Sequence, residues 1–163
     1  MEVTHNLDRW LYRGRRPNRV ARVVNGLWAH LAAAGIGPRR LMTLEITGRR
    51  SGRTVSFPVV VADHQGERYL VSMLGENTNW VRNLRAADGR AVLRHGQTDP
   101  VVLAEVPIDQ RAAILKRYLE CAPGARSHFP VDRTASTAEF ERIAARYPVF
   151  RITPVAFPVA HPS

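Results

Sequence analysis

The 163-residue sequence predicts a mostly β, α+β fold: a small closed antiparallel barrel with helices on its outside and at its ends. Two observations lead to this fold class. The segments between the predicted strands are turns or short local helices, which favours antiparallel neighbours over a doubly wound parallel sheet. The strands themselves are six short segments rich in β-branched and apolar residues, at 41–46, 55–62, 68–74, 90–95, 100–106 and 149–155.

The first predicted element is an amphipathic helix over residues 18–34, ended by Gly35-Ile-Gly-Pro38. Its apolar stripe has helical spacing and consists of Val20, Val23, Val24, Leu27, Trp28 and Leu31. So regular a stripe favours packing on the domain, although a basic amphipathic helix also suits peripheral contact with an anionic membrane. We therefore expect a single domain in three parts: a basic N-terminal segment with this helix packed on the barrel (1–40), the cofactor-binding barrel (41–155) and a tail (156–163).

The remaining helices are short and lie between the strands. The sequence predicts a helix within residues 75–89, capped by Asn77 or Thr78 and stopped by Asp88-Gly89. Asp109 is predicted to cap a second helix, and Ser136 or Thr137 to open a third that runs to about Arg146. The other connections are predicted as hairpin turns at 64–67 and 96–97 and a loop at 121–134.

The positive charge is concentrated in the first third of the chain. Residues 9–53 hold eleven arginines against one acid, Glu45, so this segment carries the whole formal charge of +10. Such asymmetry favours an anionic partner: a polyanionic cofactor, an acidic membrane surface or nucleic acid. Aromatic residues make up only 7% of the chain, with no basic–aromatic motif for base stacking, which argues against nucleic acid.

The sequence also bounds location and chemistry. It shows no apolar segment long enough to span a bilayer and no secretory signal, and Cys121 is its only cysteine, all of which favours the cytoplasm. No dinucleotide-binding or P-loop glycine motif occurs, the six histidines lack metal-ligand spacing, and no serine sits in a nucleophile elbow. We expect no metal and no catalytic side chain, a pattern suited to a cofactor that carries the chemistry itself.

The most informative segment is Thr47-Gly-Arg-Arg-Ser-Gly-Arg53, between the first two predicted strands. Glycine permits a tight reversal and a close backbone approach. The arginines place guanidinium groups around exposed backbone N–H groups, an arrangement suited to phosphate or carboxylate. The loop alone is equally compatible with a solvated basic hairpin that binds nothing.

This loop, Pro58 in the following strand, and the W-x-x-N-L motif of Trp80, Asn83 and Leu84 together resemble the deazaflavin-dependent nitroreductase family. That family belongs to the flavin/deazaflavin oxidoreductases, so the resemblance implies a six-stranded antiparallel split β-barrel and coenzyme F-420, a deazaflavin with a polyanionic tail. It further implies hydride transfer from reduced deazaflavin to an activated acceptor such as a quinone, nitro-aromatic or enone. The similarity runs from about Leu41 to Val155.

By motif position, the resemblance implies a set of cofactor-binding residues. The phosphate and tail would be held by the loop residues Gly48, Arg49, Arg50, Ser51 and Arg53. The cofactor would lie along Ser56 and Pro58, with its ring edge at Ser72, Met73 and Leu74. The ring would also be contacted by Trp80 and Asn83. Tyr118, Phe129 and Tyr147 are candidates for the substrate side.

Several alternatives remain open at this stage. Some relatives carry a lysine after the third strand, where this chain reads Met73-Leu74-Gly75, so FMN in the same fold is an alternative cofactor. A non-catalytic binder of an anionic ligand, lipid or haem is a different class of protein with the same barrel. The sequence leaves the oligomeric state open, and a homodimer is compatible with a barrel whose cofactor site draws on a partner chain.

Overall fold

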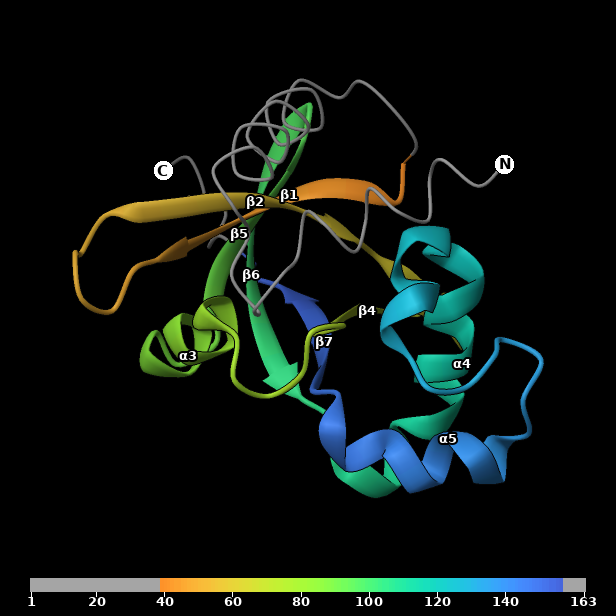
Figure 1. Ribbon diagram of the computed structural model, residues 1–163. Helices are drawn as coiled ribbons and strands as arrows, with labels where there is room; N and C mark the ends of the chain where they lie inside the picture. Colours follow the sequence, from red (N-terminus) through yellow and green to blue (C-terminus); the bar gives the residue numbers. More distant parts are fainter. Residues whose placement is uncertain (1–38, 157–163) are drawn as a thin grey trace, which may run out of the picture.

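Seven strands form the body of the protein in the computed structural model, which describes residues 39–156 (Figure 1). All neighbouring strands run antiparallel. The strands are β1 (Leu41–Thr47), β2 (Thr54–Val60), β3 (Ala62–His64), β4 (Glu67–Val71), β5 (Arg90–His95), β6 (Gln97–Glu105) and β7 (Val149–Pro154).

The sheet closes on itself because its two edge strands are consecutive in the chain. Its order is β2-β1-β5-β6-β7-β4-β3, and only Val61 separates β2 from β3. β2 pairs with β1 along its whole length, whereas β3 pairs with β4. One stretch of chain therefore serves both edges, which curls the sheet into the predicted barrel. The predicted strand 55–62 is thus divided in two, so the structure has seven strands where the sequence predicts six.

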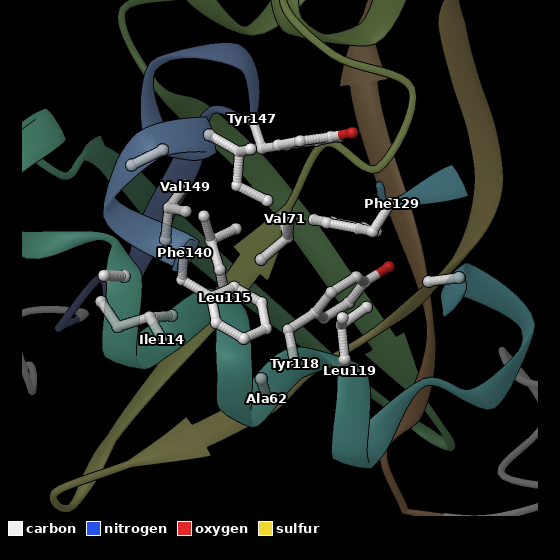
Figure 2. Close-up of a cluster of buried hydrophobic side chains, with 14 of the residues drawn as sticks. Ala62, Val71, Ile114, Leu115, Tyr118, Leu119, Phe129, Phe140, Tyr147 and Val149 are labelled. Atoms are coloured by element: carbon white, nitrogen blue, oxygen red, sulfur yellow. The ribbon is translucent and has the colours of Figure 1, made fainter. Parts of the chain in front are cut away.

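Two hydrophobic cores lie on the two faces of this sheet. The barrel interior holds Leu44, Leu93 and Phe150, each at most 1% exposed. The other face, at β4 and β7, packs against the helices through Val71 and Val149 (Figure 2). Full burial of each large apolar side chain contributes about 1.5–3 kcal/mol, so both cores stabilise the arrangement of the elements around them.

Within residues 39–156, three α-helices lie around the barrel: α3 (Asn79–Ala86), α4 (Ala112–Cys121) and α5 (Thr137–Ile143). The helix predicted within 75–89 is confirmed as α3, with Thr78 at its N-cap position. α4, the second predicted helix, buries Ile114, Leu115, Tyr118 and Leu119. Short 3₁₀ helices occupy Ile108–Gln110, Pro123–His128 and Ala144–Arg146, so the segment predicted as a loop at 121–134 contains one of them.

The predicted cap of the second helix is wrong. Asp109 lies inside the 3₁₀ helix Ile108–Gln110, and Arg111 holds the N-cap position of α4. The physical reason is that the Arg111 side chain is buried, 5% exposed, and its Nε donates to the Val106 carbonyl at 2.8 Å. Burial of Arg111 therefore fixes where α4 begins, in place of an aspartate cap.

Some expectations concern residues outside the described range. The N-terminal helix predicted at 18–34, with its packing or membrane contact, lies there, as does nearly all of the predicted tail. The division into residues 1–40, 41–155 and 156–163 therefore stays a prediction. Within residues 39–156, no helix has the length and apolar character needed to cross a membrane.

α5 begins with a reciprocal cap at Ser136, one of the two residues that the sequence predicts to open this helix. The Ser136 hydroxyl accepts from the Glu139 N–H, and the Glu139 carboxylate accepts from the Ser136 N–H at 2.8 Å. The Ser136 backbone N–H and hydroxyl both donate to the charged Glu139 carboxylate, and these hydrogen bonds lower the pKa of Glu139.

We expect Ser136→Ala to lower the free energy of unfolding by about 1 kcal/mol, because α5 loses its cap. Urea denaturation at neutral pH measures the change. Ser127→Ala is the matched control, since Ser127 is exposed outside the α-helices. Equal stability of the two variants would contradict the role of the cap.

Candidate cofactor-binding site

The basic loop between β1 and β2 is a tight, internally bonded turn. The Gly48 N–H donates to the Arg53 carbonyl at 2.8 Å, and the Gly52 N–H donates to the Gly48 carbonyl at 2.9 Å. The Ser51 hydroxyl oxygen accepts from the Arg53 N–H at 3.2 Å. A Cβ on Gly48 would lie 2.8 Å from the Ser51 Oγ and 3.2 Å from the Arg53 carbonyl oxygen, so a side chain there would require both neighbours to shift.

Asn83 of α3 binds this loop through its side-chain amide. Its side-chain oxygen accepts from the Arg49 backbone N–H at 3.2 Å and from the Arg49 Nη1 at 2.8 Å. Asn83 is only 7% exposed whereas Arg49 is exposed, so the contact is partly buried. The structure thereby joins the two motifs of the predicted site, which lie 34 residues apart in the sequence.

The remaining donors of the loop are directed outward. Arg49, Arg50, Ser51 and Arg53 are exposed, and within residues 39–156 none of the three arginines forms an ion pair. No hydrogen bond within that range engages the N–H groups of Arg50 and Ser51 either. Unpaired guanidinium groups and free N–H groups on a braced turn fit a phosphate or carboxylate group. The N–H groups of Gly48 and Arg49, in contrast, are used inside the protein.

The segment between β4 and α3 is the second component of the site. Ser72 is 1% exposed; its N–H donates to the Pro148 carbonyl at 2.9 Å and its hydroxyl donates to the Gly75 carbonyl at 2.7 Å. The same hydroxyl lies 3.3 Å from that of Thr78. Ser72 therefore shapes the segment from inside, and the half-buried Met73 and Leu74 form its accessible part.

Met73 and Leu74 border a hollow of about 430 Å3, a volume typical of small-molecule sites. One wall comes from the β4–α3 segment, and the other comes from the 3₁₀ helices Pro123–His128 and Ala144–Arg146 with the adjoining Tyr147. The lining residues are Met73, Leu74, Gly75, Glu76, Asn77, His128, Arg146 and Tyr147. The loop arginines and Trp80 are not among them, so hollow and loop are separate parts of the surface. Within the described range, no cluster of three or more His, Cys, Asp or Glu side chains could hold a metal ion.

Trp80 packs mainly against the barrel core. Its ring centroid lies 6.0 Å from that of Phe57 and 5.4 Å from that of Phe150. Since Trp80 is half-buried, part of its surface remains accessible on the first turn of α3.

The structure does not bring Ser56 and Pro58 to the hollow. In β1 and β2, directly paired residues share a face, and Phe57 pairs with the buried Leu44. Ser56 and Pro58 alternate with Phe57, so they lie on the opposite face of β2 from the one that packs on Trp80.

The three aromatic candidates for the substrate side form one continuous cluster, in which Phe129 and Tyr147 are stacked and Tyr118 is tilted against Phe129. The Phe129 and Tyr147 rings are nearly parallel with centroids 4.1 Å apart, and the Tyr118 ring lies 6.3 Å from that of Phe129. Figure 2 shows all three on one side of the hydrophobic cluster. Only Tyr147 lines the hollow, and its hydroxyl donates to the His128 carbonyl at 2.9 Å. Phe129 and Tyr118 support it from within the core.

Sequence reasoning missed four charged residues: Glu76 and Arg146, which line the hollow, and Glu105 and Arg111, which are linked to its walls by ion pairs and hydrogen bonds. Arg146 lies next to Tyr147, which the sequence does single out, and the other three are ordinary charged residues in sequence. Their contacts join segments far apart in the chain, and no local spacing signals such contacts.

Solved structures show that this architecture is shared. A protein described as a domain-swapped dimer is 15% identical, with 83% of this chain and 94% of that chain covered at a TM-score of 0.51. A protein of unknown function from Agrobacterium tumefaciens is 14% identical, with 85% and 55% covered at a TM-score of 0.52. A structure described as an F-420-H2 dependent reductase is 18% identical, with 71% and 95% covered at a TM-score of 0.47. The first two place the chain in a known class of mostly β, barrel-like folds.

The family is identified by the sequence match. The model of the F-420H(2)-dependent quinone reductase family matches residues 20–135, well over half of the chain. The protein therefore belongs to this family and is an oxidoreductase with F-420 as its cofactor. This confirms the deazaflavin prediction and favours it over the FMN alternative. None of the curated proteins compared matches the sequence.

We expect Gly48→Ala to lower the free energy of unfolding by about 1–2 kcal/mol, because the added methyl group would press on the Arg53 carbonyl. Urea denaturation measures this. Gly124→Ala is the matched control, since a Cβ on Gly124 would meet nothing within 4 Å. An unchanged stability of Gly48→Ala would mean that the turn adapts to a side chain.

Burial raises the pKa of the Tyr118 hydroxyl. The folded protein therefore keeps a proton that the unfolded chain releases above about pH 10. This stabilisation is complete below that pH and is lost as the pH rises toward the folded-state pKa.

We accordingly expect the free energy of unfolding to fall above about pH 10, with Tyr118 contributing up to about 1.4 kcal/mol per pH unit. Urea denaturation at about pH 8 and pH 10.5 measures the slope. Tyr118→Phe should make the slope shallower, and an identical slope in the variant would contradict this account.

Proposed function

We propose that this protein transfers a hydride from reduced F-420 to a quinone-like acceptor, with the cofactor extended from the basic loop to the hollow. The double hydrogen bond between Arg49 and Asn83 is the observation that carries the proposal. It couples the anion-binding turn to α3, and the segment that leads into α3 borders the hollow. In Figure 1, α3 lies between the β1–β2 turn and the helices α4 and α5.

The two ends of this arrangement suit the two ends of the cofactor. The tail is polyanionic, and the turn offers Arg50, Arg53 and the outward part of the Arg49 guanidinium. Each charge-assisted contact contributes about 1.5–3 kcal/mol where partly desolvated. The ring is planar and largely apolar, and the half-buried Met73, Leu74 and Trp80 offer apolar surface along the path from turn to hollow.

The chain's own residues would contribute binding and orientation. When bound, reduced F-420 supplies the hydride, so the protein needs no nucleophile or general base for that step. The turn would anchor the tail, the β4–α3 segment would orient the ring edge, and the walls of the hollow would exclude water around the acceptor.

A quinone is the acceptor class that the family description favours. The hollow is large enough for a mono- or bicyclic ring, and Tyr147 gives it an aromatic wall for a planar acceptor. Nitro-aromatics and enones share the flat shape and the polarised oxygen of quinones, and they are the acceptors to compare.

We expect Arg49→Ala to raise the dissociation constant for F-420 about tenfold, because the tail loses one charge-assisted contact and the turn loses the side-chain half of its double hydrogen bond to Asn83. Quenching of F-420 fluorescence during protein titration measures the constant. Arg133→Ala is the matched control, an exposed arginine on the loop that leads to α5. Equal effects of the two variants would contradict a specific role of the turn and would mean that F-420 binds to a diffuse basic surface.

The same titration with FMN tests the choice of cofactor. The proposal expects F-420 to bind more tightly than FMN by at least tenfold, because the shorter FMN tail meets fewer of the loop arginines. Tighter binding of FMN would overturn it.

A further inference from the structure

The hollow contains one cation whose charge is not neutralised within the described part of the chain. Arg146 lines the hollow, and its Cζ lies 5.7 Å from the centroid of the Tyr147 ring. It forms no ion pair within residues 39–156. The acid on the opposite wall, Glu76, is bound to Arg85 at 2.5 Å, so its negative charge is already compensated. The hollow therefore favours a ligand that carries negative charge or a polarised oxygen.

A buried framework fixes the backbone that carries Arg146. The Arg111 Nη1 donates to the carbonyl groups of Ala144 and Tyr147, at 3.3 and 3.4 Å, which flank Arg146 on either side. Arg111 also pairs through its Nη2 with Glu105 at 3.2 Å. The Arg111 side chain is only 6% exposed, so its bonds compete little with water.

The same framework reaches the opposite wall of the hollow. Arg85 binds Glu105 at 2.8 Å on one side and Glu76 at 2.5 Å on the other. Gly75, with a φ of +90°, brings the β4–α3 segment against the Arg146 backbone, and a Cβ there would lie 3.2 Å from the Arg146 carbonyl oxygen. Both walls are therefore tied to one ionic chain, which fixes the backbone from which the exposed Arg146 side chain extends at the rim.

We propose that Arg146 is the acceptor-binding residue of this enzyme, and that its guanidinium contacts the oxygen on which negative charge develops when the acceptor is reduced. This inference rests on the proposed function, and it assigns the acceptor end of the site separately from the cofactor end. The acceptor class that it selects is planar, with a carbonyl or nitro oxygen or an anionic substituent directed at Arg146.

The balance of the reaction explains the need for a cation. A quinone gains a hydride, which brings two electrons and one proton, while the cofactor is oxidised by two electrons. A second proton from solvent completes the hydroquinone. Until that proton arrives, one acceptor oxygen carries negative charge, and a guanidinium held beside it stabilises that charge. The charge is larger in the transition state than in the bound quinone, so the contact favours turnover as well as binding.

Binding is tested on the protein saturated with oxidised F-420, which has no hydride to give. The probe is anthraquinone-2-sulfonate, a planar quinone with one negative charge, measured by equilibrium dialysis. We expect Arg146→Gln to raise its dissociation constant about tenfold and Arg146→Lys to restore most of the affinity. Arg142→Gln is the matched control, an exposed arginine of α5 that does not line the hollow.

Turnover is tested with reduced F-420 and menadione, an uncharged quinone. We expect kcat/KM to fall about tenfold or more in Arg146→Gln and to stay within about twofold in Arg142→Gln. The dissociation constant for F-420 itself should stay within about twofold in both variants, because neither residue belongs to the turn.

The outcomes separate the two proposals. Unchanged probe affinity and unchanged kcat/KM in Arg146→Gln overturn the acceptor role. A loss of F-420 affinity in that variant also overturns it, because Arg146 would then bind the cofactor. If the wild-type protein binds no F-420, the proposed function is itself wrong and the acceptor role falls with it.

Discussion

The candidate site depends on the continuity of β2 and β3. The stretch from Thr54 to His64 pairs first with β1 and then with β4, so the chain must bend at Val61 and the sheet must close. The Val61 N–H donates to the Arg40 carbonyl at 2.8 Å, which holds the bend against the start of β1. Closure creates an interior that α3 covers with Val81 and Leu84, at most 1% exposed. α3 packed in this way presents Asn83 to the β1–β2 turn, so the contact between the two motifs follows from how the sheet closes.

The hollow arises for a related reason, because the strands β4 and β7 bury both faces. Phe150 faces the barrel interior and its neighbour Val149 faces the helices, so each strand belongs to both cores. The segment that follows β4 toward α3 and the segment that leads from Arg146 into β7 lie next to each other, and the hollow lies between them. Burying Arg111 there is costly unless every donor finds an acceptor, and three carbonyl groups and Glu105 supply them.

The sequence predicts well what depends on neighbouring residues and poorly what depends on distant ones. Period-two runs place the strands, and local capping signals place α3 and α5 within a few residues. The failure at Asp109 comes from Arg111, whose burial is decided by carbonyl groups up to 36 residues away. The division of one predicted strand at Val61 is likewise a property of the closed sheet. The loop arginines and the W-x-x-N-L motif are visible in sequence, but the bond between Arg49 and Asn83 and the lining of the hollow are products of tertiary packing.

The distribution of paired and unpaired charge gives the site its electrostatic character. The acids near it are compensated: Arg85 holds Glu76 and lowers its pKa, and Arg85 and Arg111 share Glu105. Farther away, a hydrogen bond from Arg40, supported by Arg117, lowers the pKa of Asp63 to about 2. The turn arginines and Arg146, in contrast, form no ion pair within residues 39–156. Positive charge is therefore uncompensated at the turn and at Arg146, and between them α3 carries the exposed Arg82, whose guanidinium donates to the neutral Asn77 side chain. A ligand with a polyanionic tail and a planar apolar ring matches this distribution from the turn toward the hollow, and an electron-accepting oxygen matches its far end.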